Sequence, residues 1–166
     1  TILDRSDAEG IINLIKSSLE VGGDNKRFPS KRVILNILSG AVNKSRQLDD
    51  LVYDHYSHLI EFLDDFNRIQ KHYTQFKRDH GLMDYDDLLV HLRDVLANIP
   101  EVREEVASRF QYVMVDEYQD TNHVQYMIVK SLAADNENIC VVGDDAQSIY
   151  AFRGANIQNI LNFKKD

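Results

Sequence analysis

Residues 112–145, YVMVDEYQDTNHVQYMIVKSLAADNENICVVGDD, decide the fold class that we expect for this chain. Two short apolar runs, 112–115 and 139–142, flank a segment in which apolar residues recur at helical spacing, at Val124, Met127, Ile128 and Leu132. Strand, helix and strand in this order predict a parallel crossover unit, whose strands are apolar because both faces of the sheet are covered. The stretch therefore predicts an α/β fold with a parallel sheet.

Upstream of this stretch, the sequence has a helical pattern from Ser6 to about Arg109, with apolar positions every three or four residues. Ser6 and Glu9 have the spacing of a capping box, which predicts the start of a first helix. A break that contains two glycines and Pro29 follows, and Ser30 can cap a second helix.

The segment 48–80 carries the longest apolar stripe, formed by Val52, Tyr56, Leu59, Leu63, Phe66 and Tyr73. Such a stripe is typical of the buried face of a helix. Another helix is expected from about Asp84 to Ala97, and Pro100 suits the first turn of the next one. We therefore expect two domains: a mainly helical subdomain at 1–109 and part of a sheet-containing domain at 110–166.

Composition limits the classes of protein to which the chain can belong. The 19 Lys and Arg against 27 Asp and Glu give a net charge of −8, the wrong sign for a free-standing nucleic-acid binder. No run approaches the roughly 18 apolar residues of a membrane span, and no basic-then-apolar leader opens the chain, so we expect a cytoplasmic protein without a membrane partner. Cys140 lies in the apolar run ICVV and is expected to be a reduced core residue.

Acidic residues follow both predicted strands, at the edge where ligands of open parallel sheets bind. Asp116 and Glu117 end the first strand, a pattern suited to nucleotide hydrolysis, in which the first carboxylate holds magnesium and the second activates water. Asp144 and Asp145 follow the second strand. If the four carboxylates converge on a metal ion without a nucleotide, a metal-dependent hydrolase is an alternative.

Several polar residues are interpreted structurally instead. Asp120 and Thr121 are good helix caps, and we expect them to start the helix that follows. Acidic pairs such as Asp64 with Asp65 and Asp86 with Asp87 are expected to be solvated faces rather than catalytic dyads. His55 and His58 have the spacing of two metal ligands, but no third ligand is evident in the sequence.

Two longer strings resemble helicase motifs of the UvrD/PcrA/Rep branch of superfamily 1. VDEYQDTNHVQ at 115–125 is similar to motif II, and VVGDDAQSIYAFRGA at 141–155 is similar to motif III. MDYDDLL at 83–89 looks like the segment that precedes the carboxylate strand, and the opening TILDRSDAEGIINLI looks like the start of the helical insertion 1B. The resemblance implies that 110–166 is part of a RecA-like P-loop NTPase domain, 1A.

The resemblance also implies roles for individual residues. Asp116 would bind Mg²⁺ and Glu117 would activate water, while Gln119 would lie at the nucleotide. In the motif III string, Gln147 would sense the terminal phosphate of ATP. The DNA strand and the domain interface would be contacted by Tyr150, Phe152 and Arg153, with Phe152 standing where well-known members have Trp. The alternative for Tyr118, Tyr150 and Phe152 is that they are buried aromatic residues.

The resemblance implies ATP and Mg²⁺ as cofactors of a parent protein that moves 3′→5′ on single-stranded DNA and separates duplex DNA. The phosphate loop GxxxxGK[ST] is absent from the sequence, and the chain opens at Thr1 without Met. We therefore expect an internal fragment that is inactive alone and that partners the remaining motor domains. Two parallel strands form a poor sheet, so self-association is also expected. The alternative function is a non-catalytic helical interaction or strand-binding module.

Overall fold

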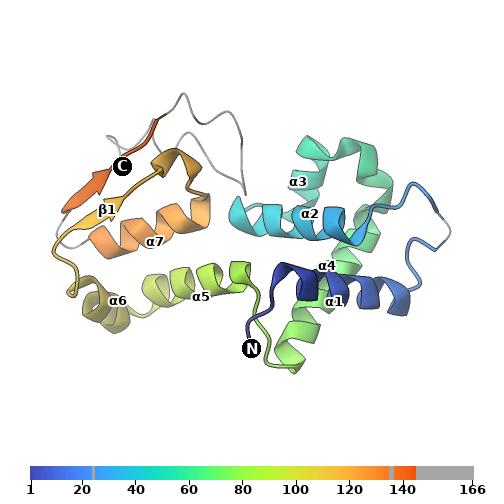
Figure 1. Cartoon of the computed structure of the whole chain (residues 1–166), viewed down its shortest axis with the longest axis horizontal. Coiled ribbons are helices and arrows are strands. Elements are labelled where there is room, and N and C mark those ends of the chain that lie inside the picture. The colour runs from blue at the N-terminus through green and yellow to red at the C-terminus, as the bar shows by residue number, and fades with distance from the viewer. Residues whose placement is uncertain (24, 135–136, 145–166) are drawn as a thin grey trace. The chain divides into compact units, whose positions relative to one another are not determined.

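The computed structural model describes residues 1–23, 25–134 and 137–144 (Figure 1). The chain divides into two compact units, the first formed by Thr1–Val42 with Arg46–Leu88 and the second by Asn43–Ser45 with Leu89–Asp166. Within the described residues, helices dominate and a small two-stranded parallel sheet lies in the second unit. No helix of these ranges is long and apolar enough to cross a membrane.

The first unit is built from helices around one apolar core. Its elements are α1 (Arg5–Ser18), α2 (Lys31–Asn43), α3 (Leu48–His55), the 3-10 helix η1 (Ser57–Phe62), α4 (Leu63–Asp79) and the start of α5 (Tyr85–Asn98). At the centre of the core, Ile12, Ile34 and Phe66 are fully buried. Phe28, in the loop between α1 and α2, packs edge-on against Phe62 with ring centroids 5.0 Å apart and lies against this core.

The first helix begins earlier than the sequence pattern predicts. Its N-cap is Asp4, whose Oδ1 accepts a hydrogen bond from the Asp7 backbone N–H at 2.8 Å. The Asp7 side chain returns a bond to the Asp4 N–H, which completes a capping box, so the box that we predicted at Ser6 and Glu9 is wrong. Both pairs have the same spacing, and the structure uses the one nearer the chain start.

The stripe in 48–80 is divided among three elements rather than one helix. Tyr56 leaves the helical region with φ −134°, so α3 ends at His55 and η1 and α4 follow. The predicted apolar face is nevertheless buried, because Val52, Leu59, Phe66 and Tyr73 belong to the core, and Tyr56 and Leu63 pack against it.

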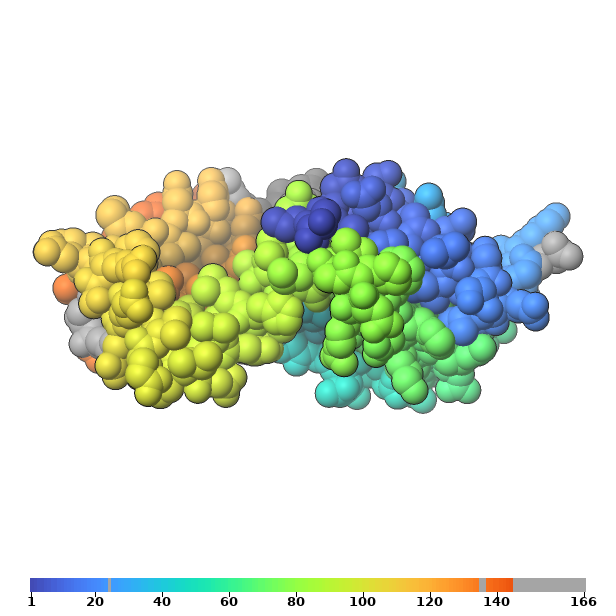
Figure 2. Space-filling model, turned by 90° about the horizontal axis from the view of Figure 1, so that it is seen from below, coloured from blue at the N-terminus to red at the C-terminus, as the bar shows by residue number. Residues whose placement is uncertain are grey.

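A short backbone contact joins the start of the chain to the segment between α4 and α5. Leu3 N donates to Met83 O at 2.8 Å, and Met83 N donates to Thr1 O at 3.0 Å. Figure 2 shows the first residues, in dark blue, lying on the green segment that leads from α4 into α5. These bonds hold Met83 immediately before α5 begins.

The second unit contains the strand–helix–strand unit that the sequence predicts. Its elements are the rest of α5, α6 (Pro100–Ala107), β1 (Val113–Val115), the 3-10 turn η2 (Tyr118–Asp120), α7 (His123–Ala133) and β2 (Ile139–Val141). The strands pair in parallel with Val113 opposite Ile139 and Val115 opposite Val141. Figure 1 shows α7 beside β1. Leu96 of α5 and Val124 of α7 are fully buried in the core of this unit.

One face of this strand pair is exposed, contrary to the prediction that both faces are covered. Met114, which pairs with Cys140, is 77% exposed, and Cys140 is exposed too. The interpretation of Cys140 as a core residue is therefore wrong. Within the described residues, the crossover helix α7 packs on β1. Neighbouring side chains along a strand point to opposite faces of the sheet. Met114 and Cys140 therefore lie on the face opposite to that of the half-buried Val113 and Val115.

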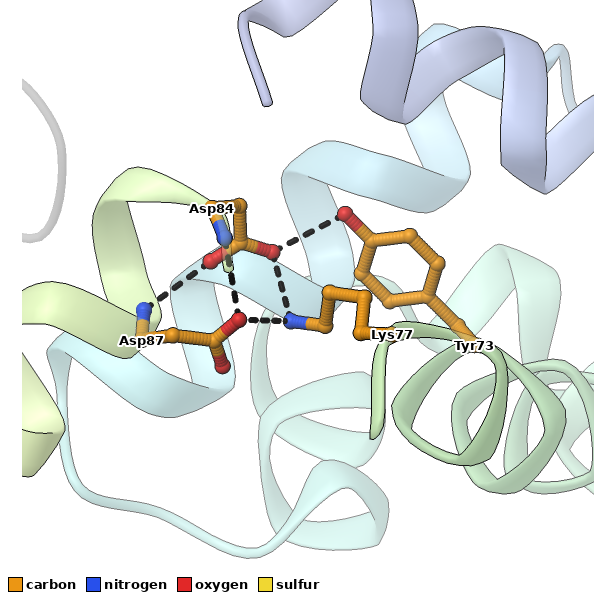
Figure 3. Close-up of polar contacts among 4 residues, drawn as sticks. All are labelled: Tyr73, Lys77, Asp84 and Asp87. Carbon is orange, nitrogen blue, oxygen red and sulfur yellow. Dashed lines mark hydrogen bonds and ion pairs between the residues drawn. The ribbon is translucent and has the colours of Figure 1, made fainter. Parts of the chain in front are cut away.

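A buried polar cluster fixes the start of α5 within the first unit (Figure 3). Lys77 Nζ lies 2.7 Å from Asp84 Oδ2 and 2.6 Å from Asp87 Oδ2, and its side chain is only 9% exposed. Tyr73 donates its hydroxyl hydrogen to the same Asp84 oxygen at 2.9 Å. Asp84 and Asp87 also accept hydrogen bonds from each other's backbone N–H groups. Asp87 is therefore not part of a solvated face, and that interpretation was wrong.

The contacts in the cluster shift the pKa values of Asp84 and Tyr73. Burial alone raises the pKa of Asp84. Its pKa is nevertheless held below its usual value by hydrogen bonds from Lys77, the Asp87 N–H and Tyr73 and by the positive charge of Lys77. Burial raises the pKa of the Tyr73 phenol, and the neighbouring Asp84 carboxylate raises it further. At neutral pH Asp84 is thus ionised and the Tyr73 phenol keeps its proton.

Replacing Lys77 with Met should lower the free energy of unfolding by about 3 kcal/mol, because two carboxylates would remain partly buried without their cation. Urea unfolding followed by circular dichroism measures this loss. The control is Lys71→Met, which removes an exposed lysine from the same helix and should change stability by less than about 0.5 kcal/mol. Equal effects of the two substitutions would contradict the role of the cluster.

The contribution of Asp84 should disappear in acid. Since its folded pKa lies below the unfolded value of about 3.9, its stabilisation is complete above that pH and is lost as pH falls through the folded pKa. The stability difference between the wild type and Asp84→Asn should therefore stay nearly constant from about pH 7 to about pH 5 and shrink as the pH falls below about 4. Asp64→Asn, at an exposed position of α4, should show no such convergence, and a constant difference for Asp84→Asn would refute the prediction.

Candidate functional site

The two predicted acidic strand ends lie next to each other at one edge of the sheet. Val142 N donates to Val115 O at 2.8 Å, and Tyr118 N donates to Val142 O at 2.9 Å. These two backbone bonds continue the pairing of β1 and β2 past the last paired residues of the strands. The chain that leaves β1 and the chain that leaves β2 are therefore held together where Asp116 and Glu117 stand.

Asp116 is the first residue after β1 and its side chain is exposed. Its Oδ1 accepts a hydrogen bond from the Glu117 N–H at 2.9 Å, which fixes the orientation of the carboxylate. Oδ2 makes no hydrogen bond or ion pair with the part of the chain that the structure describes. Magnesium commonly takes one or two carboxylates and several waters, so this oriented, exposed carboxylate fits such an ion.

Glu117 adopts a left-handed backbone conformation with φ 50° and ψ 43°. This region is uncommon for a residue other than glycine, and it makes the chain turn sharply away from β1. Asp120 N donates to Glu117 O at 2.8 Å, which closes the short η2 turn. The side chain of Glu117 remains exposed at the strand edge, where a water molecule can reach it.

Gln119 lies beneath Glu117 and is 1% exposed. Its Nε2 donates to Glu117 Oε2 at 2.6 Å, and its Oε1 accepts from the Asp144 backbone N–H at 3.0 Å. The sequence places Gln119 in the motif but gives no sign of these partners. The structure thus connects a predicted site residue to the chain that leaves β2.

The residues on either side of Gln119 form the base of the loop. Tyr118 is 1% exposed, so the alternative that it is a buried aromatic residue is confirmed. Thr121 donates its hydroxyl hydrogen to Tyr118 O at 2.6 Å rather than capping the next helix. The N-cap of α7 is Asn122, which forms a capping box with Gln125, so the prediction that Asp120 and Thr121 start this helix is wrong.

Asn122 has a second partner in the same unit. Its Nδ2 donates to Asn43 Oδ1 at 2.7 Å, and both residues are only 4% exposed. Because its Oδ1 accepts from the Gln125 N–H at 2.8 Å, the Asn122 amide is satisfied at both ends. The loop after β1 therefore has a fixed end at Asn122 as well as a fixed beginning at β1.

Four predicted site residues lie outside the described residues, namely Gln147, Tyr150, Phe152 and Arg153, as does Asp145. Within the described ranges, no three His, Cys, Asp or Glu residues form a group that could hold a metal ion. The alternative of a metal-dependent hydrolase therefore has no cluster of ligands at Asp116, Glu117 and Asp144 in this part of the chain.

Comparison with known proteins gives the family of the chain. Residues 1–166 match the family described as UvrD/REP helicase N-terminal domain, and the chain belongs to this family. Over 169 residues it is 38% identical to the ATP-dependent DNA helicase PcrA of Staphylococcus aureus and 37% identical to that of Staphylococcus epidermidis. Each match covers 100% of this chain and 22% of the relative. The chain thus spans about a fifth of the length of these helicases.

Replacing Asn122 with Ala should lower the free energy of unfolding by about 2 kcal/mol, because α7 loses its cap and Asn43 loses a buried partner. Urea unfolding measures the change. Asn122→Ser is the matched control: it keeps a capping oxygen but cannot reach Asn43, so we expect roughly half of the loss. If Asn122→Ala is as stable as the wild type, neither bond holds the loop in place.

Proposed function

We propose that the chain supplies the water-activating part of the ATP site of a 3′→5′ DNA helicase. The observation that carries the proposal is the oriented pair Asp116 and Glu117 at the end of β1, of which Glu117 is linked through Gln119 to the chain that leaves β2. The pair stands in a chain that matches a helicase family over residues 1–166. In this proposal, ATP hydrolysis drives movement along single-stranded DNA and the separation of duplex DNA.

Asp116 holds Mg²⁺ in this proposal, and Glu117 accepts a proton from the attacking water. When bound, the ion neutralises charge on the phosphates. The support for these roles is geometric: Asp116 has one oxygen engaged by the Glu117 N–H, and Glu117 has one oxygen engaged by Gln119. Within the described part of the chain, each carboxylate therefore has a fixed orientation and a second oxygen that makes no hydrogen bond or ion pair.

The roles of four further residues rest on the motif resemblance alone. Gln147 would sense the terminal phosphate of ATP, because a neutral amide can bond a phosphate oxygen. Tyr150 and Phe152 would stack on bases, which is independent of base identity, and Arg153 would lie along the strand and the domain interface.

The subdomain assignment is also part of the proposal. Residues 1–109 would correspond to the helical insertion, 1B, and 110–166 to part of the RecA-like domain, 1A. In support, the helices before Asp79 share a core of their own, and the parallel β1–β2 pair follows at Val113. The remaining motor domains would supply the phosphate loop, which the sequence 1–166 does not contain.

Residues 1–166 expressed alone should not hydrolyse ATP above background, with or without single-stranded DNA and Mg²⁺, because no GxxxxGK[ST] loop encloses the phosphates. The full-length gene product that contains them should show DNA-stimulated hydrolysis. In that protein, Glu117→Gln should lower kcat by about 100-fold or more while ATP still binds, because the proton acceptor is lost. Phosphate release and nucleotide binding measure the two quantities.

The matched control is Glu137→Gln in the full-length protein, which makes the same change just before β2, away from the site, at an exposed position. It should leave kcat within about twofold. Hydrolysis that survives Glu117→Gln would refute the catalytic role and favour a non-catalytic strand-binding module. Glu117-dependent hydrolysis by residues 1–166 alone would refute the expected need for further domains.

A further inference from the structure

The side-chain amide of Gln119 is hydrogen-bonded to protein groups at both its nitrogen and its oxygen. Both polar atoms of its amide are engaged by the protein, Nε2 by Glu117 and Oε1 by the Asp144 N–H. The residue is 1% exposed, whereas Asp116 and Glu117, which immediately precede the turn, are exposed. An amide that is buried and engaged at both ends acts on its protein neighbours rather than on a ligand.

We propose that Gln119 is a positioning residue, which sets the orientation of the Glu117 carboxylate and ties it to the chain that leaves β2. This inference rests on the proposed role of Glu117 in ATP hydrolysis. It replaces the direct contact with nucleotide that the motif resemblance implies for Gln119.

The partners of Gln119 leave only one orientation of its amide. The Asp144 backbone N–H can only donate, so the atom of Gln119 that faces it is the oxygen. The NH₂ group therefore faces Glu117, whose carboxylate can only accept when it is ionised. The bond of 2.6 Å joins a donor to a charged acceptor, which is the stronger class of hydrogen bond.

This bond has a direct consequence for water activation. Glu117 Oε2 is held by Gln119, while Oε1 makes no hydrogen bond or ion pair within the described ranges. A proton from water would therefore be taken up by a single, oriented oxygen. Because a small misplacement of a catalytic group can cost on the order of 100-fold in rate, holding the side chain in one orientation matters for kcat.

The bond from the Asp144 N–H links the site to the chain that leaves β2. Gln119 Oε1 and the backbone bond from Tyr118 N to Val142 O both connect the turn after β1 to the chain after β2. The amide therefore forms a continuous hydrogen-bonded path from the Asp144 backbone to the Glu117 carboxylate. A displacement of the chain after β2 would move the proton acceptor as well.

Steady-state ATP hydrolysis by variants of the full-length gene product, at saturating single-stranded DNA, tests the inference. Gln119→Glu keeps an acceptor for the Asp144 N–H but places a carboxylate against Glu117. Gln119→Met keeps the length and removes both bonds. Both variants should lower kcat by on the order of 10–100-fold and leave KM for ATP within about twofold. Gln125→Glu, the same change in a capping box, should leave both constants unchanged.

The double variants with Glu117→Gln separate positioning from a general structural role. If Gln119 acts through Glu117, adding Gln119→Met to Glu117→Gln should lower the residual single-turnover rate by less than about twofold, because the group being positioned is already gone. A loss in the double variant equal to that in the single variant would overturn the inference in favour of a structural role. If Gln119→Met does not fold, Gln119→Glu carries the same comparison.

The steady-state constants of the Gln119 variants can also contradict the positioning role. A raised KM with unchanged kcat would overturn the inference in favour of direct contact with the nucleotide, and wild-type constants in both Gln119 variants would overturn it outright. If Glu117→Gln itself hydrolyses ATP at the wild-type rate, the proposed function fails first. If Glu117→Gln is inactive and the Gln119 variants are normal, only the inference fails.

Discussion

The parallel pairing of β1 with β2 is the constraint on which the candidate site depends. The register places Val115 opposite Val141, and backbone bonds from Val142 N and Tyr118 N extend the pairing beyond them. Parallel strands bring their carboxyl ends to one edge, so the residues that follow each strand become neighbours although the whole of α7 separates them in sequence. Without this pairing, Gln119 could not reach the backbone of Asp144.

The turn after β1 combines an uncommon backbone conformation with a buried polar side chain. Glu117 is held in a left-handed conformation, and the buried amide of Gln119 lies under its carboxylate. Uncommon backbone conformations and buried polar groups persist only where the surroundings hold them. Here those surroundings are the strand pair at one end and the capped start of α7 at Asn122 at the other, so stability and chemistry depend on the same hydrogen bonds.

The sequence predicted the strand–helix–strand unit and the buried helical stripe, because both depend on apolar periodicity, which is local. It failed where several residues offer the same local chemistry. Asp4, Ser6, Thr121 and Asn122 are all good caps; the structure uses Asp4 and Asn122, and of these Asn122 also bonds to the distant Asn43. It also failed for Cys140, since an apolar run does not reveal which face of a strand another element covers.

The residue types at the strand ends can be read directly from the sequence, and its motifs sufficed to indicate the helicase family to which the chain belongs. The hydrogen-bond and ion-pair partners came from the folded chain instead: Gln119 bonds to Glu117 and Asp144, and Lys77 of α4 pairs with the acidic start of α5. The reason is physical, since side-chain partners depend on burial and on the path of the backbone through a left-handed turn. Neither is encoded in spacing along the chain.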